Sequence, residues 1–167
     1  MTRATIVVCL VTIAMSSVAV AAEKFKPAPG CLKRWSEVAE LEASLKGKRK
    51  VPYDQKNNPL QRCNADQPIV DGEMRRTHEP QIAIIVFDVT GSGRAVGQHL
   101  IGPKTHWAEL SEQSLSRTLF APFVEDGIGI TRVGITMVFI AEFEPSCDKL
   151  ESPVVFQNYD IRICANR

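Results

Sequence analysis

The feature that most constrains the fold is the recurrence of apolar residues at every second position at each end of the stretch from Gln81 to Phe143. Apolar side chains occupy every second position from Ala83 to Val89 and again from Val133 to Phe143. A period of two over this length is typical of strands with one buried face. We therefore predict strands at 81–89 and 130–143.

The residues between these strands complete a compact unit. The glycines of Thr90-Gly91-Ser92-Gly93 suit a tight turn into a second strand, 94–101. Apolar residues at helical spacing then predict a helix over 107–120, which Pro122 ends. The predicted fold class is α+β: an antiparallel three-stranded sheet in β-β-α-β order packed on a helix, with an N-terminal helix and a short C-terminal β tail.

The first residues have the pattern of an export signal. Arg3 precedes an uncharged apolar run, and Ala19-Val20-Ala21 resembles a cleavage site. We predict a signal peptide over 1–21, cleaved near Ala21-Ala22, and a periplasmic or secreted protein with no integral membrane span after cleavage. The alternative is an uncleaved anchor, because residues 4–22 are just long enough to cross a bilayer.

Four cysteines follow the leader: Cys31, Cys63, Cys147 and Cys164. An even number in an exported chain predicts disulfides, and four cysteines allow three connectivities. We favour Cys31–Cys63 with Cys147–Cys164, because each pair then lies on one side of the central unit. No C-x-x-C pair is present and the histidines are far from the cysteines in sequence, so no metal site is predicted.

Composition and motifs narrow the function classes. The 20 basic and 19 acidic residues give a net charge of +1, too balanced for nucleic acid to be the main partner. Gly91-Ser92-Gly93 lacks the Lys of a phosphate loop, and His78-Glu79-Pro80 lacks the second His of a zinc-protease helix. His106 is interpreted as a helix-start residue. We predict no catalytic residue, no cofactor and no enzyme.

The remaining segments are assigned by their patterns. Residues 22–77 form an N-terminal extension with an amphipathic helix at 32–46. The basic run Lys46 to Lys50 is interpreted as complementing the helix end, with phosphate binding as the alternative. Residues 78–146 form the central domain. The Cys-containing tail, 147–167, contains two predicted short strands, 154–156 and 159–164.

Three features of the central domain occur in the order found in a known family. They are Asp88-Val89 leading to the Gly91–Gly93 turn, Phe120-Ala121-Pro122 at the helix end, and the turn Glu125-Asp126-Gly127 before the last strand. Over residues 82–143 the chain resembles the C-terminal domain of the TonB family of periplasmic energy transducers. It departs from that pattern at Gly102-Pro103-Lys104, where paired serines are usual, and at Thr118, where an aromatic residue is usual.

The resemblance implies a binding function. In that family the domain captures an extended segment of an outer-membrane receptor by strand addition, and the last strand has this role. By resemblance, Arg132, Thr136, Val138 and Ile140 would meet a peptide of an envelope protein on the face away from the helix. For Val138 and Ile140 the alternative is packing under the N-terminal helix or the tail. For the whole protein the alternatives are a cell-envelope structural protein whose tail fills the sheet edge and, ranked last, a small exported enzyme.

Overall fold

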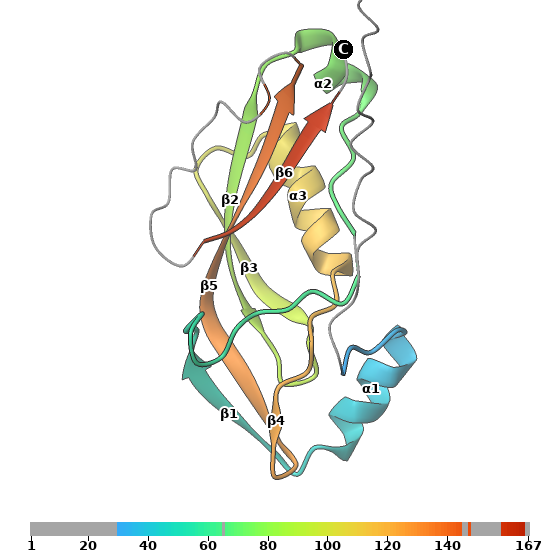
Figure 1. Ribbon diagram of the computed structural model, residues 1–167, viewed down its shortest axis with the longest axis vertical. Coiled ribbons are helices and arrows are strands. Elements are labelled where there is room, and N and C mark those ends of the chain that lie inside the picture. Colours follow the sequence, from blue (N-terminus) through green and yellow to red (C-terminus); the bar gives the residue numbers. More distant parts are fainter. Residues whose placement is uncertain (1–29, 65, 145–146, 148–157, 166–167) are drawn as a thin grey trace, which may run out of the picture.

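The computed structural model describes residues 30–64, 66–144, 147 and 158–165 (Figure 1). The predicted signal peptide and the predicted strand at 154–156 lie outside these residues. The elements in chain order are α1 Trp35–Ser44, β1 Gly47–Pro52, α2 Gly72–Thr77, β2 Gln81–Val89, β3 Ala95–Ile101, α3 His106–Arg117, β4 Val124–Glu125, β5 Ile128–Phe143 and β6 Asn158–Ala165.

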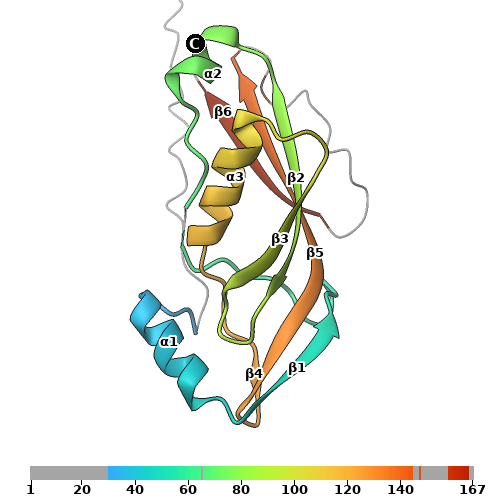
Figure 2. The same ribbon diagram turned by 180° about the vertical axis from the view of Figure 1, so that it is seen from behind.

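The strands form one mixed, strongly curled sheet around β5 (Figures 1 and 2). Antiparallel β2 lies along one edge of β5, and β3 lies outside β2. Along the other edge, β1 runs parallel to the first part of β5 and β6 runs parallel to the last part. The α+β class is confirmed. The antiparallel three-stranded sheet and its β-β-α-β order are wrong, because the sheet has six strands and β4 intervenes before β5.

Strand β1 was missed because its sequence lacks an apolar alternation. Lys48, Arg49 and Lys50 are exposed, and β1 joins the sheet through its backbone ladder with β5. Arg49 Nη2 lies 2.6 Å from Glu125 Oε2 of β4. Charged side chains on an edge strand discourage pairing with other chains. Most of the basic run, from Lys48 to Lys50, is therefore part of a strand.

A β-bulge divides β5 into two parts. Phe87 lies opposite Ile135 and Val89 lies opposite Arg132, so two steps along β2 match three steps along β5. Gly134 supplies the positive φ of 76° at this point, and its N–H donates to Asp88 Oδ1 at 3.1 Å. An extra residue reverses which face each later side chain occupies. Alternation therefore does not run unbroken through β5.

The main core lies between α3 and the sheet face that contains Phe87 and Met137. Thr105 caps α3 by accepting from Ala108 N–H, and the helix begins at His106 as expected and ends at Arg117, earlier than predicted. Trp107 is buried and its Nε1 donates to the Phe139 carbonyl at 3.1 Å. The largest fully buried side chains include Ile85, Phe87, Trp107, Leu115, Phe120, Ile135, Met137 and Phe139.

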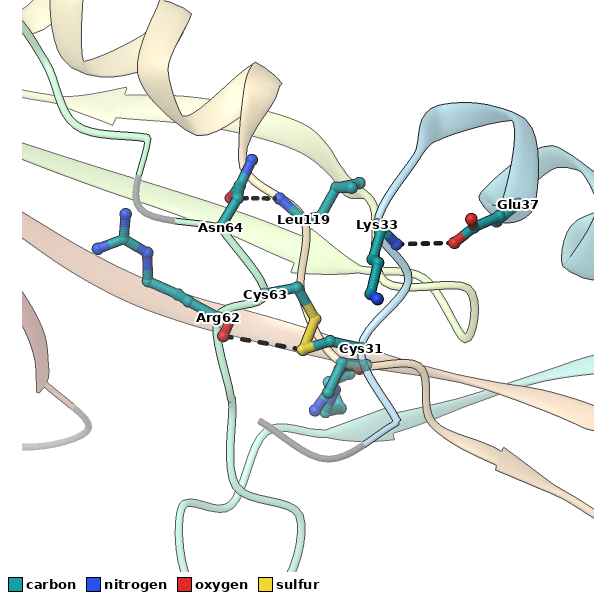
Figure 3. Close-up of a disulfide and its surroundings, with 9 residues drawn as sticks. Cys31, Lys33, Glu37, Arg62, Cys63, Asn64 and Leu119 are labelled. Carbon is teal, nitrogen blue, oxygen red and sulfur yellow. Dashed lines mark hydrogen bonds between the residues drawn. A yellow bond between two sulfur atoms is a disulfide. The ribbon is translucent and has the colours of Figure 1, made fainter. Parts of the chain in front are cut away.

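A smaller cluster anchors α1 to the body beside a disulfide (Figure 3). Cys31 and Cys63 are bonded, with Cα atoms 5.2 Å apart, and Cys147 and Cys164 form the second pair. Both are the pairs that we favoured. Val38 and Leu119 are buried beside Cys63, and Cys63 N–H donates to the Leu119 carbonyl at 2.7 Å. Helix α1 is shorter than predicted. Among the described residues, no helix is long and apolar enough to cross a membrane.

Candidate functional site

The edges of β5 are occupied within the chain. β2 pairs with residues 132–141 on one edge, and β4 continues that edge at 128–129. On the other edge β1 pairs with 128–133 and β6 with 136–143. The prediction that β5 offers an open edge to a peptide is therefore wrong, because β1 and the tail strand β6 already use that edge.

The four residues predicted to meet a peptide do not share one exposed face. Val138 and Ile140 are fully buried, and Thr136 is half-buried. These three share the face away from α3, as predicted. Arg132 lies on the opposite face, because the bulge at Gly134 places it opposite buried Val89. The structure therefore separates Arg132 from the other three residues.

Strand β3 is an end of the sheet. It pairs with β2 alone, so its outer backbone N–H and C=O groups have no strand partner among the described residues. Next to the turn that follows, Ile101 is 50% exposed and lies opposite Ile84 of β2. Unpaired backbone groups beside an apolar surface are what strand addition needs.

An apolar strip on the face away from α3 adjoins this free edge. Directly paired residues share a face, so Ile101 and Ile84 lie together, with Ile82 two residues along β2. Ile82 is 36% exposed and His99, opposite Val86, is exposed. We name Ile82, Ile84, Val86, His99 and Ile101 the β3 strip.

Arg132 is a charged side chain inside the body of the protein, only 2% exposed. Its Nη1 donates to the Pro59 carbonyl at 3.0 Å and its Nη2 to the Ala121 carbonyl at 2.9 Å. Its Nε has no hydrogen-bond partner, and none of the described carboxylates pairs with it. Burial lowers the pKa of Arg132 to about 10, so the side chain stays charged at neutral pH.

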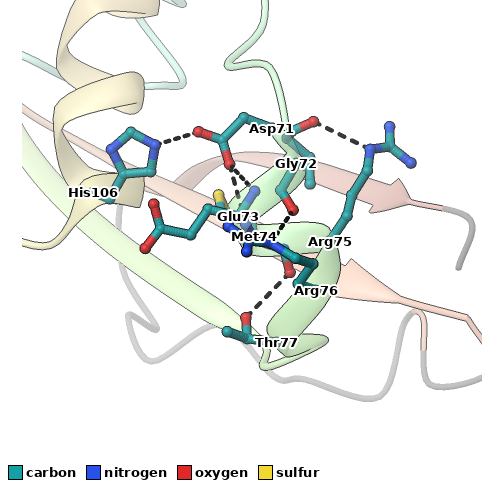
Figure 4. Close-up of polar contacts among 9 residues, drawn as sticks. Asp71, Gly72, Glu73, Met74, Arg75, Arg76, Thr77 and His106 are labelled. Carbon is teal, nitrogen blue, oxygen red and sulfur yellow. Dashed lines mark hydrogen bonds and ion pairs between the residues drawn. The ribbon is translucent and has the colours of Figure 1, made fainter.

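A second polar cluster joins α2 to α3 (Figure 4). Asp71 caps α2 by accepting from the N–H groups of Glu73 and Met74, and its other oxygen is bonded to His106 Nε2. The bond to His106 lowers the pKa of Asp71, and the same bond raises the pKa of His106. Both side chains are partly exposed, beside an open cavity of about 160 Å³.

The described residues around this cluster do not form a metal site. Glu73 and Glu79 line the cavity with His106, but no three acidic, histidine or cysteine side chains are placed to hold a metal ion. We interpret the Asp71–His106 pair as a bond between the two helices. Sequence reasoning missed it because α2 was not predicted, although Asp71-Gly72 followed by Glu73 is a usual helix start.

A scan against models of known families gave no match to this chain, and a search of curated proteins gave none either.

Proposed function

We propose that the protein is an exported binding module that takes up an extended peptide segment of a cell-envelope protein along β3. The observation that carries this proposal is the position of β3 at the end of the sheet, with the exposed Ile101 beside its free edge. An added strand gains backbone hydrogen bonds along its length, and its alternate side chains meet the β3 strip. The resemblance to the TonB family supports the mode of binding, with β3 in place of the last strand.

The export part of the proposal is supported by two features. The predicted signal peptide directs the chain out of the cytoplasm, and two disulfides are usual in oxidising compartments. Together with the family resemblance, these two features support a periplasmic or secreted location.

Site-directed photocrosslinking tests this proposal. A photoreactive residue at His99 should crosslink, in envelope extract, to one extended segment of a partner, whereas the same residue at Gln113 on α3 should not. A synthetic peptide of that segment should then slow amide exchange in β3 and leave α3 unchanged. If the peptide slows the exchange of no β3 amide, strand addition along β3 is contradicted.

The second candidate is a cell-envelope structural protein without a peptide partner. It is favoured by the complete pairing of β5, in which β1 and β6 fill the edge that the family resemblance would leave open. The pairing of β3 with β2 is also irregular near Gly97, and such irregularity disfavours the pairing of an edge strand with another chain. Under this candidate the β3 amides exchange at the same rate with and without envelope extract, and neither crosslinker position gives a product.

A further inference from the structure

The environment of Arg132 has the character of a binding site and not only of a packed core. A buried guanidinium loses its hydration, and native proteins normally compensate this loss with a carboxylate. Here the hydrogen-bond acceptors are two neutral carbonyl groups. The guanidinium has five N–H donors, so three of them have no acceptor among the described residues. Positive charge at this place is therefore incompletely compensated within the part of the chain that the structure describes.

A cavity of about 200 Å³ opens beside Arg132. Its walls come from two loops, the one after β1 and the one after α3. Neutral side chains line it with Arg132: Asn57, Asn58, Gln61, Ala121, Pro122 and Phe123. No acidic residue is among them, although Asn57 Nδ2 donates to the Asp54 carboxylate and Asn58 Nδ2 to the Pro52 carbonyl. An anion entering the cavity therefore meets one positive charge and the side-chain amide of Gln61.

The walls of the cavity are held in place before any ligand arrives. Asp54 N–H donates to Asn58 Oδ1, and Asn58 Nδ2 donates to the Pro52 carbonyl at 3.0 Å, which closes the loop after β1. Arg132 itself bridges this loop to the loop after α3. The Phe123 ring lies against the guanidinium, with 5.6 Å between Arg132 Cζ and the ring centre. A preformed site binds with little loss of conformational entropy.

We propose that this cavity is a binding site for the carboxylate of a small organic acid or of a peptide C-terminus. One guanidinium matches a singly charged, planar carboxylate. A phosphate, with up to two charges, normally needs further cations or a helix N-terminus, and none lines this cavity. The Gln61 side-chain amide on the wall can donate to a carboxylate, and Phe123 offers an apolar surface to the attached group. The proposal is independent of the β3 edge.

A purely structural role for Arg132 is the competing interpretation. Its two bonds to the Pro59 and Ala121 carbonyls tie two loops together, and this role needs no ligand. The two interpretations differ in one respect that can be measured in the unmutated protein, namely whether a carboxylate gives a saturable response at this cavity.

The test uses the full chain with its disulfides intact and sodium benzoate as the probe. Nitrogen-15 NMR should show a saturable shift of the Arg132 Nε–H signal and of the Gln61 side-chain amide. Benzamide, which has the same shape without the charge, should shift neither. An acetylated dipeptide with a free carboxylate, compared with its amidated form, distinguishes a peptide terminus from a free acid as the better ligand.

Two variants complete the test. Arg132→Lys keeps the charge but loses the planar fork, and should weaken benzoate binding about tenfold or more. Gln61→Ala changes an exposed wall residue that the loop does not need, and should weaken binding by a smaller factor. Equal shifts with benzoate and benzamide, or no saturable shift with either acid, would overturn the proposal even if Arg132→Lys failed to fold.

Discussion

The two parts of β5 differ in what their buried face contains. After the bulge, Ile135, Met137 and Phe139 face α3 and form the centre of the core. Before the bulge, the same face presents Arg132, which lines an open cavity. The neighbours differ too, because β6 flanks the later part and β1 and β4 flank the earlier one. A single inserted residue thus lets one strand serve both as core and as the wall of a polar site.

The first prediction compares how much each part of β5 contributes to the free energy of unfolding. Phe139→Ala should lower the free energy of unfolding by about 3–5 kcal/mol, because it empties a fully buried site beside Trp107. Ile128→Ala, at the 38% exposed start of β5, should cost about 1 kcal/mol. Guanidinium denaturation measures both. Equal losses would mean that the two parts of β5 do not differ in packing.

The second prediction concerns the two disulfides, one beside α1 and one that includes Cys164 of β6. Replacing Cys31 and Cys63 with Ser should lower stability by about 2–4 kcal/mol, because the bond closes a separation of 32 residues. The Cys147–Cys164 bond closes a separation of 17, so its loss should cost about 0.6 kcal/mol less. Denaturation of the two double variants gives the comparison. A clearly larger loss for the second pair would point to native contacts, and not loop closure, as the source of its effect.

The third prediction examines the bulge that separates the parts. Gly134→Ala should cost about 1–2 kcal/mol, because a Cβ meets nothing within 4 Å and the strain of the positive φ is the whole effect. Gly134→Asn should cost less, since Asn tolerates this conformation. At Gly93 a Cβ would lie 2.0 Å from the Phe120 carbonyl oxygen, so Gly93→Ala should cost more than Gly134→Ala. No loss on Gly134→Ala would show that the bulge is not formed in solution.

The smallest expected effect is a pH dependence outside both parts of β5. The pKa of His106 is raised by its bond to Asp71, so the stabilisation is complete below the unfolded value of about 6.5 and is lost as pH rises through the raised pKa. The pKa of Asp71 is lowered by the same bond, so its contribution is lost as pH falls through that lowered pKa.

Thermal unfolding between pH 5 and pH 9 in the native protein and in His106→Asn measures this contribution. The difference between the two should shrink as the pH rises. Because the pair is partly exposed, the effect should be modest and should decrease with added salt. A difference that stays constant over this range would mean that the bond to Asp71 does not depend on the charge of His106.

Sequence reasoning succeeded where one local pattern decides the structure. The strand Gln81–Val89 and the start of α3 at His106 follow from alternation and helical spacing, and they lie where expected within one residue. It failed for elements that have no side-chain pattern of their own. β1 is a charged edge strand recognisable only through its partner, and α2 is too short to show a helical period.

The candidate sites were predicted less well than the strands. Arg132 was named for a face that it does not occupy, since alternation cannot reveal a bulge that depends on the register between β2 and β5. Val138 and Ile140 were named for a docked peptide, with packing as the alternative, and the structure buries both. The loop wall around Asn57 and Gln61 has no periodic signal at all.

The sequence by itself determined the strands β2, β3, β5 and β6 and helix α3, and its cysteine positions favoured the pairing that the structure has. These outcomes depend on neighbours in the chain, whose spacing is visible in the residues. Only the tertiary structure decided that β5 has no free edge, that β3 ends the sheet and that Arg132 faces inward. Each of these depends on register between distant segments, and register is set by packing that no local pattern records.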